Sequence, residues 1–194
     1  MSATVDNDAS DEALMTCLRD GDDHALAPLM ARWEMPMKRY LARVVQNAHE
    51  AEELAQETFV KLYQSRARFR EGVRFSPWLY AIAANLARNR LRWWRRRPAV
   101  SLEAWTDFGG ETADESNAGR AASGALEQRE RAEAVREAVA ALPVELRVAL
   151  VFCEYEGLTQ AEAAEALGVT PKAVEMRLYR ARAGLRNQLQ RWLA

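Results

Sequence analysis

A block of arginines interleaved with aromatic rings, at residues 66–97, carries the strongest chemical signal in the sequence. It holds ten arginines against a single acid, Glu71, for a charge of about +9. Its aromatic residues are Phe69, Phe75, Trp78, Tyr80, Trp93 and Trp94. Cations can follow a phosphate backbone while bases stack on rings, so the block favours contact with single-stranded nucleic acid. Helical projection places Asn85, Arg88, Arg92 and Arg95 on one face, and Trp78, Leu79, Ile82, Leu86 and Trp93 on an inward one.

Residues 159–185 have the spacing of a helix-turn-helix, and a second basic block, residues 172–191 with six bases and one acid, overlaps its second helix. Thr159 and Glu162 form a capping box, Gly168 can end that helix in a left-handed conformation, and Thr170-Pro171 begins the next. The second helix should bury Val174, Leu178, Ala181 and Leu185. Its outer face, which enters the major groove in this motif, carries Lys172, Met176, Tyr179 and Arg180, with Glu175 at its edge and Arg177, Arg182 and Arg186 flanking it. A helical hairpin with a solvated basic face is the alternative.

An acidic helix face is expected opposite the apolar stripe of a helix at residues 49–66. The stripe is Leu54, Ala55, Thr58, Phe59 and Leu62, and the opposite face carries Glu53, Gln56, Glu57, Val60 and Gln64. Spacing alone leaves two interpretations open. In the first, the face is solvated and carries a weak Glu57–Lys61 ion pair. In the second, it binds a partner, as the exposed apolar Val60 among acids suggests.

Catalytic and metal-binding motifs are missing from the sequence. His24 and His49 are isolated, and the aspartates around Gly21 lack the spacing of a calcium loop. The sequence has no glycine-rich phosphate loop, zinc-binding pattern or nucleophile elbow. We therefore expect no enzyme activity, metal or cofactor.

The same sequence argues for a cytoplasmic protein. The acidic, polar first twelve residues are not a secretory signal. No apolar run approaches the ~18 residues of a membrane span, so we expect no membrane insertion. The two cysteines, Cys17 and Cys153, lie in apolar helical contexts, and a reducing compartment is the default.

The elements that position these residues are all expected to be helices. The chain has 194 residues, and its net charge of -1 hides two basic blocks separated by an acidic stretch. That stretch, residues 98–126, has five acids, one base and four of the nine glycines, which favours a flexible linker. The predicted fold class is therefore all-α, with two small helical domains, at residues 10–97 and 127–194, joined by a flexible acidic linker.

Turn and capping residues predict where the helices begin and end. Ser10 should cap the first helix, which Gly21 ends. The second spans residues 23–45 and should break or kink at Pro36. After the helix at 49–66 and a loop, Ser76-Pro77 should begin a long helix to Arg97. Further helices are expected from 127 to Pro143, over 144–155, and in the helix-turn-helix.

Three segments together resemble bacterial RNA polymerase sigma factors of the extracytoplasmic-function (ECF) group. They are residues 51–63 (AEELAQETFVKLY), 75–92 (FSPWLYAIAANLARNRLR) and 141–186, in the family's order. The resemblance implies that residues 10–97 are sigma region 2, which binds core polymerase and recognises and melts the minus-ten element. It implies that residues 127–194 are region 4, which reads the minus-thirty-five element as duplex.

The resemblance also assigns partners and residues. Core polymerase would bind through its largest-subunit clamp helices and its flap, promoter DNA would bind both domains, and an anti-sigma factor is a further expected partner. The core-binding residues would be Glu53, Gln56, Glu57 and Val60. The minus-ten residues would be Arg70, Arg74, Phe75, Trp78, Asn85, Arg88 and Arg92. The minus-thirty-five residues would be Lys172, Glu175, Met176, Arg177, Tyr179, Arg180 and Arg182.

Two other functions compete with a promoter-specificity subunit. An autonomous helix-turn-helix regulator would bind duplex DNA specifically without polymerase. A nucleic-acid-processing enzyme using the basic aromatic block would show turnover. Run-off transcription with core polymerase, with and without this protein, is the decisive experiment.

Overall fold

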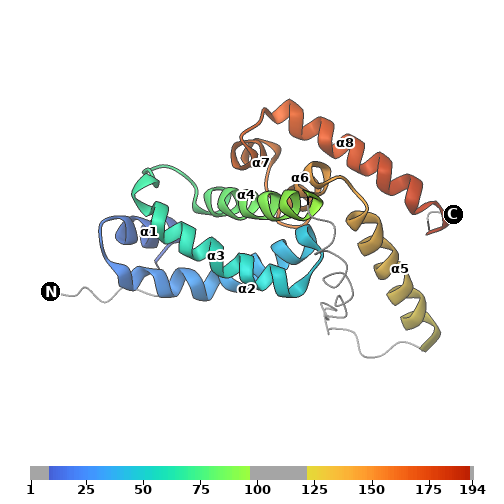
Figure 1. Cartoon of the computed structure of the whole chain (residues 1–194), viewed down its shortest axis with the longest axis horizontal. Helices are drawn as coiled ribbons and strands as arrows, with labels where there is room; N and C mark the ends of the chain where they lie inside the picture. The colour runs from blue at the N-terminus through green and yellow to red at the C-terminus, as the bar shows by residue number, and fades with distance from the viewer. Residues whose placement is uncertain (1–8, 97–121, 193–194) are drawn as a thin grey trace.

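The computed structural model describes residues 9–96 and 122–192, with side chains in the second range from residue 127, and its regular elements are helices (Figure 1). The N-terminal half, residues 9–96, contains α1 (Asp11–Arg19), α2 (Leu26–Val45), α3 (Ala48–Ser65) and α4 (Phe75–Arg96), with short 3₁₀ turns at Asp23–Ala25 and Arg66–Arg68. The C-terminal half, residues 122–192, contains α5 (Ala122–Ala140), α6 (Val144–Glu154), α7 (Gln160–Leu167), α8 (Pro171–Gln188) and a final turn at Gln190–Trp192. The predicted all-α class is confirmed.

Helix α1 is joined by side-chain hydrogen bonds to α2 and to the beginning of α4. Ser10 caps it as predicted, accepting a hydrogen bond from the Ala13 amide at 3.2 Å. In the first turn, Asp11 accepts a hydrogen bond from the indole N–H of Trp33 in α2 at 2.9 Å. The next residue, Glu12, accepts one from the amide of Phe75 at 3.0 Å. A carboxylate thus satisfies an otherwise unpaired amide at the N-terminus of α4, which its positive dipole end favours.

Helix α2 runs through Pro36 without ending, so the predicted break is wrong. Proline removes one backbone hydrogen bond, but the helix buries Leu29 on one side of Pro36 and Met37 and Tyr40 on the other. Packing on both sides therefore outweighs the lost bond. The helix ends at Gln46, in a left-handed conformation with φ 59°.

Helices α3 and α4 pack along a seam of apolar residues. The predicted α3 stripe is confirmed, because Leu54, Ala55, Thr58, Phe59 and Leu62 are all buried. On α4, Leu79 is buried while Trp78, Ile82 and Leu86 are partly buried. Trp93, predicted to face inward, is 37% exposed. Helix α3 begins only at Ala48, so few of its residues lie beside the last turns of α4, and Trp93 is not covered.

The helix-turn-helix has the predicted caps. The Thr159 hydroxyl accepts the Glu162 amide at 3.2 Å, and Glu162 in return accepts the Thr159 amide at 2.8 Å. Gly168 has φ 64°, which only glycine adopts without strain. Thr170 and Pro171 begin α8, as predicted. The second helix is therefore held at a fixed angle to the first.

The two halves share one hydrophobic core. Helix α4 lies against α7, and α2 against α6 (Figure 1). The rings of Tyr40 and Phe152 stack at 5.2 Å, and Tyr80 meets the Phe152 ring edge-on at 5.5 Å. All three side chains are buried. The sequence predicted two domains but not this contact between them.

Polar groups also cross the interface between the halves. Arg147 is almost fully buried and donates hydrogen bonds to the carbonyls of Val44, at 2.6 Å, and of Leu142, at 3.1 Å. Burial lowers the pKa of Arg147 to about 10. Glu156 accepts the Tyr80 hydroxyl at 2.7 Å and pairs with Arg43 at 3.2 Å. Burial and this carboxylate both raise the pKa of the Tyr80 phenol.

Two predicted boundaries are wrong by a few residues. Helix α4 begins at Phe75, one residue before the expected cap at Ser76, because Glu12 from α1 replaces a local cap. Helix α5 begins at Ala122, inside the linker predicted over 98–126. Residues 97–121 lie outside the described residues, and so does most of that linker. The predicted end of the long helix, Arg97, lies outside the described residues as well.

Candidate protein and nucleic-acid interfaces

The outer face of α8 is exposed on the side of the molecule away from α3 (Figure 1). Val174, Leu178 and Ala181 are buried against α6 and α7, as predicted. Tyr179 is 70% exposed and Met176 is 41% exposed. The predicted face thus presents a side-chain row of Lys172, Met176, Tyr179 and Arg180 to the solvent, all classed as exposed.

The arginines beside this face are paired with acids of α6. Arg182 pairs with Glu154 at 2.5 Å, and Arg177 with Glu145 at 3.6 Å. On α8 itself, Lys172 pairs with Glu175 at 2.8 Å. Two of the arginines expected to touch phosphates, Arg177 and Arg182, are therefore paired with carboxylates in the free chain.

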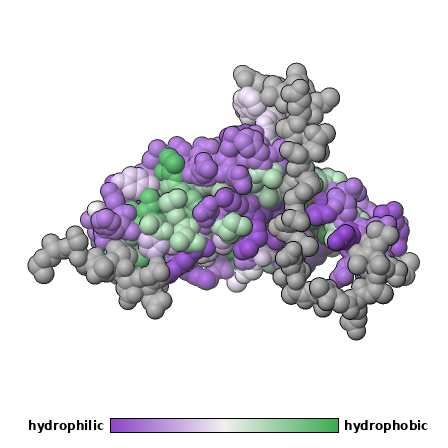
Figure 2. Space-filling view, turned by 90° about the horizontal axis from the view of Figure 1, so that it is seen from below, coloured by the Kyte–Doolittle hydropathy of each residue, from purple (hydrophilic) through white to green (hydrophobic). Residues whose placement is uncertain are grey.

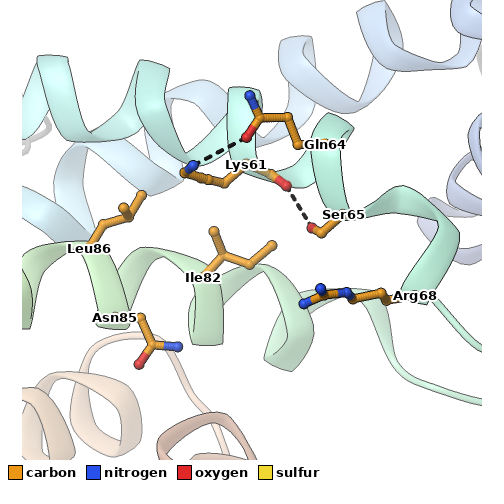
Figure 3. Close-up of a pocket in the computed structure, with 7 residues that line it drawn as sticks. All are labelled: Lys61, Gln64, Ser65, Arg68, Ile82, Asn85 and Leu86. Carbon is orange, nitrogen blue, oxygen red and sulfur yellow. Dashed lines mark hydrogen bonds between the residues drawn. The ribbon is translucent and has the colours of Figure 1, made fainter.

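A cavity of about 390 Å³ opens on the seam between α3 and α4, beside the 3₁₀ turn (Figure 3). Its floor is apolar, formed by Ile82 and Leu86, and Asn85 borders it from α4 with its side chain pointing away from α3. Its α3 rim is polar, where the Lys61 ammonium contacts Gln64 at 3.2 Å. The whole lining is Lys61, Gln64, Ser65, Arg68, Ile82, Asn85 and Leu86. We call it the Asn85 cavity.

The Asn85 cavity lies beside the loop at 66–75, but few of the predicted minus-ten residues line it. Arg88 does not line it but donates a hydrogen bond to the Asn85 side chain. Of the loop at 66–75, only Arg68 contributes. Lys61 and Ser65 were missed, although the exposed position of Lys61 on the helix at 49–66 follows from its periodicity.

The structure separates the other predicted minus-ten residues. Phe75 is fully buried and packs edge-on against Trp33 at 5.6 Å, so assigning it to DNA contact is wrong for this structure. Although Phe75 lies in the basic aromatic block of the sequence, its ring packs in the hydrophobic core. Trp78 is half-buried against Phe69, and Arg70 and Arg92 are exposed. Arg74 pairs with Glu162 of α7.

Arg88 is the least accessible of these arginines. Its side chain is 13% exposed and lies 3.8 Å from Glu145 of α6. Glu145 therefore faces both Arg88 and Arg177, one from each half of the chain. Arg88, Arg92 and Arg95 share a small cavity with the beginning of α6.

The predicted acidic face of α3 is on the surface. Gln56 is exposed and Val60 is 53% exposed. Sequence reasoning missed Arg90 of α4, which lies 3.3 Å from Glu53, 4.0 Å from Glu57 and in direct contact with Glu50. The face is therefore partly neutralised by one guanidinium from the neighbouring helix.

The rest of the surface adds few large apolar groups. Seen from the side of α2, the molecule is largely hydrophilic with separate apolar patches over the N-terminal half (Figure 2). Met30 and Met35 on α2 are among the exposed apolar side chains. No helix in residues 9–96 and 122–192 is long and apolar enough to cross a membrane. Within the same ranges, no three potential ligands from His, Cys, Asp and Glu gather as a metal site would need.

Comparison with known proteins decides between the interpretations. The family models described as Sigma-70 region 2 and Sigma-70, region 4 match residues 29–97 and 132–185. The chain is 33% identical to RNA polymerase sigma-H factor of Pseudomonas aeruginosa, over 93% of this chain and 94% of the relative. It is 30% identical to the ECF RNA polymerase sigma-E factor of Salmonella typhimurium, over 93% and 95%. The chain belongs to the ECF RNA polymerase sigma factors.

The fold agrees with this assignment. A solved structure described as the sigma factor RpoE in complex with the anti-sigma factor NepR, from Bartonella quintana, matches with a TM-score of 0.62 at 19% identity. The match covers 83% of this chain and 94% of that one. The function of this ECF sigma factor is that of an RNA polymerase sigma factor, in a family whose members are not in general enzymes. The competing autonomous regulator finds no support in these comparisons.

Proposed function

We propose that three surfaces of this sigma factor carry the steps of initiation. The acidic face of α3 binds the clamp helices of the largest polymerase subunit. The outer face of α8 reads the minus-thirty-five element. The Asn85 cavity and the neighbouring α4 arginines capture the minus-ten strand. The C-terminal half also touches the polymerase flap, an anti-sigma factor restrains the chain, and the protein acts in the cytoplasm without catalysing a step itself.

The polymerase contact is supported by exposed carboxylates around an exposed apolar residue. Val60 lies one helical turn from Glu57 and Gln56, so an apolar contact can be surrounded by polar ones. Replacing Glu53 and Glu57 by lysine should weaken binding to core polymerase and leave the fold intact. Glu34→Lys is the control, because Glu34 is an exposed carboxylate on α2, outside the acidic face of α3. Equal affinities for the two proteins would refute the assignment.

Duplex reading is supported by the exposed row on α8. The second helix of a helix-turn-helix presents such a row to base edges. Loss of a base contact should cost about 1–3 kcal/mol for the preferred site. We expect Tyr179→Ala and Arg180→Ala to relax the sequence preference. Arg182→Ala should weaken all sites alike and flatten the salt dependence by about one phosphate.

Strand capture is supported by the Asn85 cavity, and this observation carries the proposal. Opening about ten base pairs costs on the order of 14 kcal/mol, at about 1.4 per step. Two or three bases held on this chain return only about 2–9 kcal/mol, at about 1–3 each. The chain can therefore nucleate opening by holding a flipped base, while polymerase must stabilise the rest of the bubble.

Permanganate footprinting of promoter DNA tests this division. Thymine reactivity should appear only when core polymerase is present. It should fall when Asn85 and Arg88 are replaced by alanine, because the cavity rim and the residue that holds it are both lost. Asn187→Ala, an exposed asparagine near the end of α8 and outside the three surfaces, should leave the footprint unchanged. A bubble formed without polymerase, or one indifferent to the double substitution, would overturn the proposal.

A further inference from the structure

The last turns of α4 have two chemically different sides. Arg88, Arg92 and Arg95 lie toward the beginning of α6 and share one cavity with Glu145. Trp93 and Trp94 lie on the other side of the helix, next to α3. The basic aromatic block predicted from the sequence is therefore divided, with its last aromatic rings facing away from these arginines.

A second cavity, of about 560 Å³, lies beside these tryptophans between α3 and α4. Its lining combines aromatic and acidic side chains: Glu50, Leu54, Glu57, Leu86, Asn89, Arg90, Trp93 and Trp94. Trp93 is 37% exposed. Leu86 also lines the Asn85 cavity, so the two cavities follow one another along the same helix seam. We call this one the Trp93 cavity.

Its charge is negative. The carboxylates of Glu50, Glu53 and Glu57 surround the single guanidinium of Arg90. Glu53 and Glu57 keep almost half of their side-chain surface exposed. Three carboxylates against one guanidinium leave an excess of negative charge beside exposed aromatic surface.

We propose that the Trp93 cavity receives an arginine or lysine side chain from the polymerase helix that docks on α3. A cation is attracted both by carboxylates and by the face of an indole ring. The same carboxylates repel phosphates, which argues against single-stranded DNA as the occupant. The inference rests on the proposed polymerase contact of α3 and extends it onto α4, through Trp93.

Arg90 acts in this proposal as an internal counter-ion. In the free chain it neutralises part of the acidic site and holds the three carboxylates together. A partner cation joins this cluster and takes over part of the neutralisation. Removing Arg90 therefore increases the attraction for a cationic partner, and the effect is largest at low salt, where screening is weakest.

The test is a titration of the full-length chain, labelled at the exposed Cys17, with core polymerase in the absence of DNA. Trp93→Leu keeps an apolar side chain but removes the aromatic face, and we expect five- to thirty-fold weaker binding, about the value of one cation–aromatic contact. Trp93→Phe should recover most of the affinity. Met35→Ala, which removes an exposed apolar side chain from α2, is the control and should bind like the wild type. Arg90→Gln should associate faster at low salt.

Each outcome bears on a separate part of the proposal. If Trp93→Leu binds polymerase like the wild type while Glu53→Lys with Glu57→Lys binds weakly, the inference is wrong and the α3 contact stands. If neither variant weakens binding, both fail. Equal losses for Trp93→Leu and Trp93→Phe refute the cation–aromatic contact. A loss of affinity for a single-stranded promoter oligonucleotide, with unchanged polymerase binding, would assign Trp93 to DNA instead.

Discussion

Replacing Phe152 by alanine should separate the two halves of the chain before either half unfolds. The Phe152 side chain is fully buried, and its ring contacts are Tyr40 at 5.2 Å and Tyr80 at 5.5 Å. Removing a buried phenylalanine side chain costs about 3–5 kcal/mol. Both contacted rings belong to the N-terminal half, so most of this loss falls on the interface between the halves.

Small-angle X-ray scattering measures the separation directly. A compact chain of 194 residues has a radius of gyration of about 16 Å. A random coil of about 25 residues has its ends roughly 25–30 Å apart, so halves joined by the linker that the sequence predicts should show a radius of gyration larger by several ångström. Leu178→Ala is the control, because Leu178 is buried inside the C-terminal half. It should lower stability without expanding the chain. An unexpanded Phe152→Ala protein that unfolds in one transition would refute this reasoning.

Other predictions address single interactions. The raised pKa of the Tyr80 phenol means that its stabilisation is complete below about pH 10, the unfolded value, and is lost as the pH rises above it. Small-angle X-ray scattering should therefore show a larger radius of gyration at alkaline pH, and the increase should be smaller for the Tyr80→Phe protein than for the wild type. Arg147→Met should lower the free energy of unfolding in urea by about 1–3 kcal/mol for each carbonyl left without a donor, whereas Arg147→Lys should lose less. Glu12→Ala removes the cap of α4 and should cost about 0.5–2 kcal/mol in thermal unfolding. Glu34→Ala, which removes an exposed ion pair with Lys38 in the next turn of the same helix, should cost less.

Features fixed by neighbouring residues could be predicted from the sequence. The capping box of Thr159 and Glu162, the left-handed Gly168 and the Thr170-Pro171 start all lie within a few residues of the groups that they satisfy. The exposed face of α8 follows from them, because a helix with known ends and one apolar stripe has only one outer side.

Features fixed by distant residues could not be predicted. Glu12 caps a helix that begins 63 residues later, so Ser76 looked like the cap. Phe75 lies among arginines in the sequence, and its burial depends on Trp33 from another helix. Arg90 approaches Glu50, Glu53 and Glu57 across the helix seam. Periodicity gives the side of a helix on which a residue lies but not the neighbour that it meets there.

The packing of α4 against α7 limits the length of DNA that the chain can span. Promoter elements centred about 25 base pairs apart lie ~85 Å apart along B-form DNA, at about 34–36 Å per helical turn. The α4 and α8 helices, of 22 and 18 residues, are only about 33 and 27 Å long, and they lie in one compact body. The closed chain therefore cannot hold both elements at once.

The chain between the halves is long enough to remove this limit. Residues 97–121 separate α4 from α5, and about 25 residues reach at most ~85 Å when extended. Both promoter elements can be bound at once only after the ring contact between Tyr40 and Phe152 is broken. The free energy of the shared core is subtracted from the affinity for the promoter complex, as for any ligand that binds a minor conformation. Substitutions that weaken this core, without unfolding either half, should therefore make the sigma factor bind polymerase and promoter more tightly.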